Sequence, residues 1–99
     1  MFYANQYFDF NEEVNIGSDI YTTFEGKELV LKNVYRYFGP VTMQYLPYGG
    51  VQSVYDNQII LTTKSGYIAT RNLIYDGKEI SSEEFILLFP DIVNEVLPS

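Results

Sequence analysis

Between Ile20 and Tyr75, apolar and polar residues alternate in short runs, and turn-forming residues separate the runs. Alternation with a period of two predicts β-strands with one buried face, and turns of two or three residues predict hairpins. The predicted strands cover residues 20–24, 28–37, 50–55, 58–63 and 67–75. The predicted turns contain glycine, asparagine or aspartate, which tolerate a positive φ, and they are Glu25-Gly26-Lys27, Asp56-Asn57 and Lys64-Ser65-Gly66.

The predicted strand over 28–37 has an irregular pattern at its centre. Leu29 and Leu31 lie on one face, but the next apolar residue, Val34, falls out of phase with them. One extra residue at Asn33, a β-bulge, would return Val34 to the buried face. We therefore expect a bulged strand here.

A helix is predicted after the last strand. An Asp76-Gly77-Lys78 turn precedes Ser81, and Glu84 follows Ser81 by three residues, the spacing of a capping box. Apolar residues then recur at helical spacing and would cover an open side of the sheet; they are Phe85, Leu88, Ile92, Val93 and Val96. Pro90 predicts that the first helix ends near Leu88.

These elements predict a mainly β domain with one C-terminal helix. Five to six antiparallel strands joined by short turns favour a small OB-like β-barrel, and an open sheet with a helix across it is the alternative. Residues 1–19 are expected to form an N-terminal arm or a short strand, and residues 20–99 the barrel and helix of a single domain. The length of 99 residues suits one modest hydrophobic core.

The order of these motifs resembles the C-terminal accessory domain of the formyltransferase family. The resemblance covers residues 20–88 and rests on a hairpin over 20–34, the small residues Tyr48-Gly49-Gly50 before a strand, a strand opened by Gly66, and Asp76-Gly77-Lys78 leading to Ser81-x-x-Glu84-Phe85. Each piece is common by itself, and the ordered set carries the resemblance.

The family includes methionyl-tRNA formyltransferases and sugar-amine formyltransferases. The resemblance implies an OB-like domain that follows a catalytic domain, carries none of its chemistry, and in the tRNA enzymes helps to hold the tRNA. Two features depart from the family: the catalytic domain with its folate site is missing, and the chain is acidic where the tRNA-type domains are basic. The implied partners are therefore a tRNA or sugar-nucleotide substrate through a companion catalytic domain, or a protein partner.

The composition gives little support for catalysis. The chain has no histidine and no cysteine, so it lacks the commonest general base and cannot assemble a nucleophilic triad. We expect no catalytic residues, no cofactor and no metal site. No apolar run approaches the ~20 residues of a membrane span, and the amino terminus lacks signal-peptide features, so a cytoplasmic protein is expected.

Charge is segregated along the chain. The net charge is −7, but residues 1–26 and 79–99 each hold five acids and no base, whereas residues 27–78 hold all six bases and three acids. OB-type barrels bind single strands by stacking bases on aromatic rings beside a basic groove. The candidate binding residues in the basic middle are Lys32, Tyr35, Arg36, Tyr37, Lys64, Tyr67, Arg71, Tyr75 and Lys78. Alternation places Arg71 on the same strand face as Tyr67 and Tyr75.

Two other interpretations remain open at this point. Half of the tyrosines could be packing residues and the bases ordinary solvated ends, because three net positive charges anchor a phosphate backbone weakly. The acid-rich termini also suggest a different class of protein, a small acidic interaction or inhibitor protein that presents carboxylates to a basic partner surface.

Overall fold

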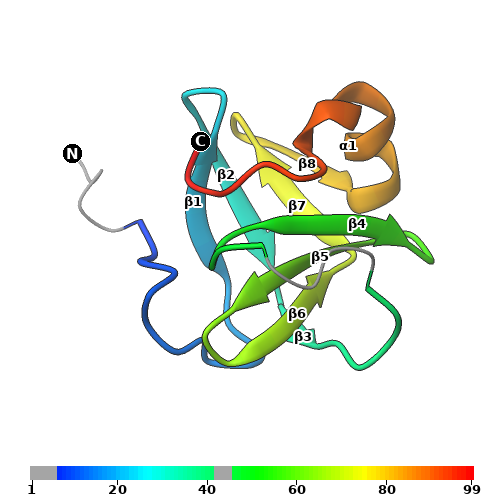
Figure 1. Cartoon of the computed structure of the whole chain (residues 1–99). Coiled ribbons are helices and arrows are strands. Elements are labelled where there is room, and N and C mark those ends of the chain that lie inside the picture. The colour runs from blue at the N-terminus through cyan, green and yellow to red at the C-terminus, as the bar shows by residue number, and fades with distance from the viewer. Residues whose placement is uncertain (1–6, 42–45) are drawn as a thin grey trace.

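The computed structural model describes residues 7–41 and 46–99. These residues form strands β1 (Ile20–Phe24), β2 (Lys27–Lys32), β3 (Tyr35–Arg36), β4 (Val51–Tyr55), β5 (Gln58–Thr63), β6 (Gly66–Thr70), β7 (Asn72–Tyr75) and β8 (Lys78–Ser81), helix α1 (Ser82–Leu88) and the 3-10 turn η2 (Pro90–Ile92). The strands make two antiparallel sheets, a first sheet in the order β1-β2-β7-β8 and a second sheet in the order β3-β6-β5-β4 (Figure 1). The predicted fold class, mainly β with a C-terminal helix, is confirmed.

Three of the hairpins share one turn geometry. Both central residues have a positive φ in the β1–β2, β4–β5 and β7–β8 connections, which are Glu25-Gly26, Asp56-Asn57 and Asp76-Gly77. Two such residues define the type I′ turn, whose twist matches that of the strands on either side. The turns predicted at these places are confirmed.

The structure has more strands than the five or six expected for two reasons. The two longest predicted strands are each divided, one into β2 and β3 and the other into β6 and β7, and β8 lies where only a link between the Asp76-Gly77-Lys78 turn and the helix was expected. The register is the same on both sides of the interruption. Lys32 pairs with Asn72, and Tyr35 pairs with Ala69, so two residues lie between the pairs on each strand. The one-sided β-bulge expected at Asn33 is therefore wrong: both strands are interrupted opposite each other.

The interruption moves the strands from one sheet to the other and changes their alternation. Asn33 has a φ of 50°, and Leu31 and Val34 on either side of it are both fully buried. On the facing strand, Thr70 and Leu73 are fully buried in the same way, with two exposed residues between them. Each strand thus keeps its apolar residues in the core although a period of two is broken.

The core lies between the two sheets and is closed by α1. Its fully buried large side chains come from both sheets, the helix and the C-terminal segment, and they are Phe24, Phe85, Ile20, Leu29, Leu31, Ile59, Leu61, Ile68, Leu73, Ile92 and Leu97. At the helix, the rings of Phe24, Tyr75, Phe85 and Phe89 pack with centroid distances of 5.1–6.1 Å. A smaller cluster on the other face of the second sheet contains Tyr37, Ile60 and Ala69.

Helix α1 begins where the capping residue was predicted. The Ser81 hydroxyl accepts a hydrogen bond from the Glu84 amide at 3.1 Å, and Pro90 starts η2 directly after the helix. Phe85 is fully buried as expected, but Leu88 is 61% exposed, so its predicted packing is wrong. The helix ends at Leu88 as predicted. After it, Ile92 is fully buried as predicted and Phe89 packs on the core without having been predicted, whereas Val96 is 39% exposed, so its predicted packing is also wrong.

The described part of the N-terminal segment, residues 7–19, forms an arm without a strand. Residues 1–6, which the predicted arm also included, lie outside the described part of the chain. Phe10 and Val14 are buried in the main core, and the Phe8 amide donates to the Tyr21 carbonyl at 2.7 Å. The arm therefore packs along β1 as part of the domain.

The C-terminal segment, residues 94–99, connects the edges of the two sheets. On one side the Leu97 amide donates to Gly49 at 2.9 Å, and the Val51 amide donates to the Glu95 carbonyl at 2.8 Å. On the other side the Ser99 amide donates to the Thr23 carbonyl of β1 at 2.9 Å. The segment thus crosses from β4 to β1, as its red trace shows in Figure 1.

Candidate functional site

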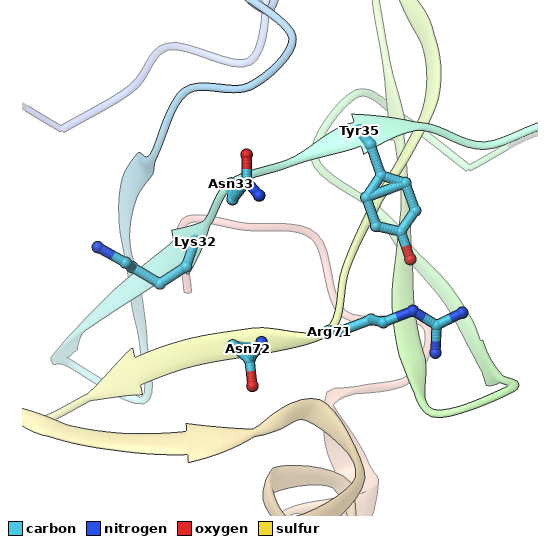
Figure 2. Close-up of a pocket in the computed structure, with 5 residues that line it drawn as sticks. All are labelled: Lys32, Asn33, Tyr35, Arg71 and Asn72. Carbon is cyan, nitrogen blue, oxygen red and sulfur yellow. The ribbon is translucent and has the colours of Figure 1, made fainter.

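An open pocket of about 170 Å³ lies at the interruption between β2 and β3 on one strand and β6 and β7 on the other. Five residues line it: Lys32, Asn33, Tyr35, Arg71 and Asn72 (Figure 2). All five lie within or beside the break, so the same departure from regular pairing that divides the strands also creates the pocket. We call it the strand-break pocket.

Side chains satisfy the backbone groups that the broken ladder leaves unpaired. The Thr70 hydroxyl lies 2.5 Å from the Lys32 carbonyl and 2.8 Å from the Asn72 carbonyl, and its single proton serves one of them at a time. The Ser82 amide donates to the Arg71 carbonyl at 2.8 Å, and the Ser82 hydroxyl donates to the Thr70 carbonyl at the same distance. These bonds replace strand pairing, so the backbone carbonyls at the break have partners and the interruption is a stable feature of the fold.

The Lys32 ammonium is paired with an acid at the pocket rim. Its Nζ lies 2.9 Å from Asp19 Oδ2, and the other carboxylate oxygen of Asp19 accepts from the Asn33 amide at 2.9 Å. The hydrogen bond from the backbone amide of Asn33, and then the bond from Lys32, lower the pKa of the Asp19 carboxyl. The hydrogen bond to Asp19 raises the pKa of the Lys32 ammonium. Both groups therefore stay charged, and the negative charge of Asp19 offsets the positive charge of Lys32.

The second cation is paired in the same way. Arg71 Nη2 lies 3.2 Å from Asp56 Oδ2, and Nη1 donates to the Asp56 carbonyl at 2.6 Å. Tyr35 is half-buried and its hydroxyl donates to Gln58 Oε1. Burial raises the pKa of the Tyr35 phenol, and the charge of Arg71 partly opposes this. The phenol is thus neutral and fixed, with its ring pointing toward Arg71 (Figure 2).

The two asparagine amides are the uncommitted groups of the pocket. Asn33 and Asn72 are exposed, and within the part of the chain that the structure describes their side chains make no hydrogen bond. Each amide offers two donors and one acceptor oxygen. With the Tyr35 ring as a wall, the pocket can bind a small polar group through donors and acceptors in a surrounding without net charge.

Only three of the nine predicted binding residues, Lys32, Tyr35 and Arg71, come together in this pocket. Arg36 lies elsewhere, where its Nη1 donates to the Ser65 carbonyl at 2.5 Å in the β5–β6 turn. The other two lysines are exposed in turns or beside them, Lys64 between β5 and β6 and Lys78 after the β7–β8 turn. Tyr67 is half-buried and packs on the smaller cluster.

Two of the predicted binding tyrosines are packing residues instead. Tyr37 is 7% exposed, and its hydroxyl donates to the Pro40 carbonyl at 2.7 Å. Tyr75 is 8% exposed, and its hydroxyl donates to the Phe24 carbonyl at 3.0 Å. Their prediction as stacking residues is wrong, as is the shared face of Arg71 and Tyr75, because alternation reverses at the break and turns Arg71 outward and Tyr75 inward.

Asn33 and Asn72 were not predicted as site residues. The signal for Asn33 was its place where the alternation of Leu31 and Val34 fails, since asparagine tolerates the positive φ that such a break needs. Asn72 gave no signal, because only the pairing with Lys32 brings it to the same place.

No protein-family model, curated protein or solved structure matches the chain. Among the described residues, no helix has the length and apolar character needed to cross a membrane. In that same part of the chain, no three of the His, Cys, Asp and Glu residues gather in a way that could hold a metal ion.

Proposed function

We propose that the chain is a non-catalytic binding module of the kind that follows the catalytic domain in formyltransferases. Its role is to position the substrate of a companion catalytic domain, or to contact a partner subunit, in the cytoplasm. The ordered motifs over residues 20–88 support this proposal, because they correspond to hairpin β1–β2, to the entry into β4, to β6–β7 and to the capped start of α1. The observation that supports a binding function is the strand-break pocket.

The chemistry of the pocket supports binding and argues against a reaction. A general acid or base needs a group that can gain or lose a proton near neutral pH. Asp19 and Asp56 are each paired with a cation, and the pKa of Asp19 is lowered further from neutrality. The phenol of Tyr35 has a raised pKa and donates to Gln58. No group of the pocket is therefore suited to transfer a proton at neutral pH.

A titration with tRNA at low salt tests the RNA branch of the proposal. Fluorescence anisotropy of labelled tRNA is measured with the wild-type chain, with Arg71→Ala in the pocket, and with Lys78→Ala as a control that removes an exposed base elsewhere. Weaker binding by Arg71→Ala alone would assign the pocket to tRNA. No binding at tens of micromolar protein would exclude tRNA, since phosphate contacts dominate such affinities.

The accessory role has a separate test in the gene itself. A folate-type transferase domain encoded next to these residues, in the same reading frame or in a neighbouring one, would support a companion catalytic domain. A coding region with no transferase nearby would count against the formyltransferase assignment, whatever the pocket binds.

A second candidate function is an acidic interaction protein, and one observation favours it. All ten acids of residues 1–26 and 79–99 are exposed, whereas three of the six bases are in ion pairs with acids, namely Lys27, Lys32 and Arg71. Of the ten acids only Asp19 is in an ion pair within the described residues, so the other nine present exposed carboxylates that are not neutralised by a base of the chain. A partner with a basic surface should be released steeply by salt, and capture of partners that are insensitive to salt would contradict this function.

A further inference from the structure

The strand-break pocket contains no uncompensated charge. Lys32 is matched by Asp19 at 2.9 Å and Arg71 by Asp56 at 3.2 Å. The two acids lie outside the lining, but each offsets the cation that it pairs with, and the chain as a whole has a net charge of −7. Phosphate sites depend on free cations or on unpaired backbone amides. The pocket is therefore poorly suited to an anion and better suited to an uncharged ligand.

The uncommitted groups offer donors and acceptors together. Asn33 and Asn72 stand on opposite sides of the break, one from each strand (Figure 2). Lys32 and Arg71 keep N–H groups beyond those bonded to their acids. A hydroxyl group donates one hydrogen bond and accepts others, so several hydroxyls on one ring match such a set. Tyr35, fixed by Gln58, supplies an aromatic wall for the apolar face of the ring.

The size of the pocket limits the ligand to one ring. A volume of about 170 Å³ is small, since pockets for larger ligands usually have about 300–1,000 Å³. We propose that the strand-break pocket binds one uncharged sugar ring, as a unit of a larger ligand. A nucleotide of a polynucleotide fits less well, because its phosphates would have to compete with Asp19 and Asp56 for Lys32 and Arg71. The inference rests on the proposed function, and it names the class of ligand for the same site.

NMR titration of the complete ¹⁵N-labelled chain tests the inference. The neutral probes are D-glucose and N-acetyl-D-glucosamine, and the anionic probes are inorganic phosphate and uridine monophosphate. We expect the neutral sugars to shift the side-chain amide signals of Asn33 and Asn72, with a dissociation constant on the order of 1 mM for about a dozen ligand atoms. We also expect this constant to stay the same between about 50 and about 300 mM NaCl, because no charge pair is formed.

Three variants separate the pocket from the rest of the surface. Asn72→Ala removes one amide, and Asn33→Gly removes the other while it retains the positive φ of 50°. Each should weaken sugar binding at least tenfold. Asn94→Gly is the matched control, because Asn94 is also exposed with a positive φ of 76° and does not line the pocket. If Asn72→Ala gives no dispersed spectrum, Asn72→Thr replaces it, since threonine suits a strand.

Each remaining outcome overturns the inference. Shifts of the pocket signals by phosphate or uridine monophosphate, but not by the sugars, would show an anion site and would leave the binding function in place. Sugar shifts that persist in Asn33→Gly and Asn72→Ala would show contact with the surface in general. If none of the probes shifts the pocket signals, the sugar assignment fails, and the accessory role then depends on the gene context alone.

Discussion

The contact between Gly49 and the C-terminal segment gives the sharpest stability prediction. Gly49 has a φ of 93°, and a Cβ atom placed there would lie 2.3 Å from the Leu97 carbonyl oxygen. Gly17 has nearly the same φ, 90°, but a Cβ atom there would meet nothing within 4 Å. The substitutions Gly49→Ala and Gly17→Ala therefore share the backbone strain and differ in the contact with Leu97.

The magnitudes follow from these two terms. Holding alanine at a left-handed φ costs about 1–2 kcal/mol, and this is the whole effect expected for Gly17→Ala. In Gly49→Ala the Leu97 carbonyl has to move as well, which breaks backbone bonds such as the one from the Leu97 amide to Gly49 at 2.9 Å. Each broken bond costs about 1 kcal/mol, so we expect a total loss of about 3–4 kcal/mol. The stability of a domain of this size is only about 5–15 kcal/mol.

Urea unfolding followed by circular dichroism measures both variants under the same conditions. The difference of about 2 kcal/mol between them should also appear as a difference in Tm of about 8–16 °C. Hydrogen exchange supplies the local readout: the Leu97 amide should exchange faster in Gly49→Ala and not in Gly17→Ala. Equal losses of stability in the two variants, with equal exchange at Leu97, would refute the close contact on which the reasoning depends.

Three further predictions concern single side chains. Thr22→Val should raise the free energy of unfolding by about 1 kcal/mol in a urea titration, because the Thr22 hydroxyl is fully buried without a hydrogen-bond partner in the described part of the chain; a loss of stability would contradict this. Ser81→Ala should lower it by about 1 kcal/mol through loss of the helix cap, whereas Ser81→Asp, which retains a capping oxygen, should not. Asp19→Asn should lower the urea midpoint at pH 6, where the wild-type carboxylate accepts from Lys32 and Asn33. Because the pKa of Asp19 is lowered from 3.8 by folding, its contribution is present above that value and is lost as the pH falls further below it. The two midpoints should therefore converge in acid, and a constant difference at all pH values would contradict the assignment.

Local sequence chemistry was sufficient to predict the β1–β2, β4–β5 and β5–β6 hairpins, whereas at Asp76-Gly77 it predicted the turn but not the strand β8 that follows. Residue pairs such as Glu25-Gly26 tolerate two successive positive φ angles, and these angles determine both the turn type and the pairing of the strands beside it. The helix start was predictable for the same reason, since Ser81 and Glu84 interact over three residues. Elements that depend on neighbours in the sequence were therefore found with their approximate bounds.

The strand-break pocket could not be predicted in this way. Its residues come from strands about 40 residues apart, and only the register of Lys32 with Asn72 brings them together. Alternation suggested one break, at Asn33, but gave no sign that the facing strand was interrupted opposite it. Tyrosine was a further source of error, because a ring that reaches a carbonyl with its hydroxyl can be buried, as Tyr37 and Tyr75 are.

The crossing of residues 94–99 from β4 to β1 has a consequence for biosynthesis. A nascent chain leaves the ribosome from its N-terminus, so every strand of both sheets emerges before the segment that joins their edges. Until that segment arrives, β1 and β4 expose unpaired backbone groups that can recruit strands from other chains. The pairing that joins the two sheets therefore forms only after residues 94–99 have left the ribosome, and a nascent chain held before that point exposes two open sheet edges.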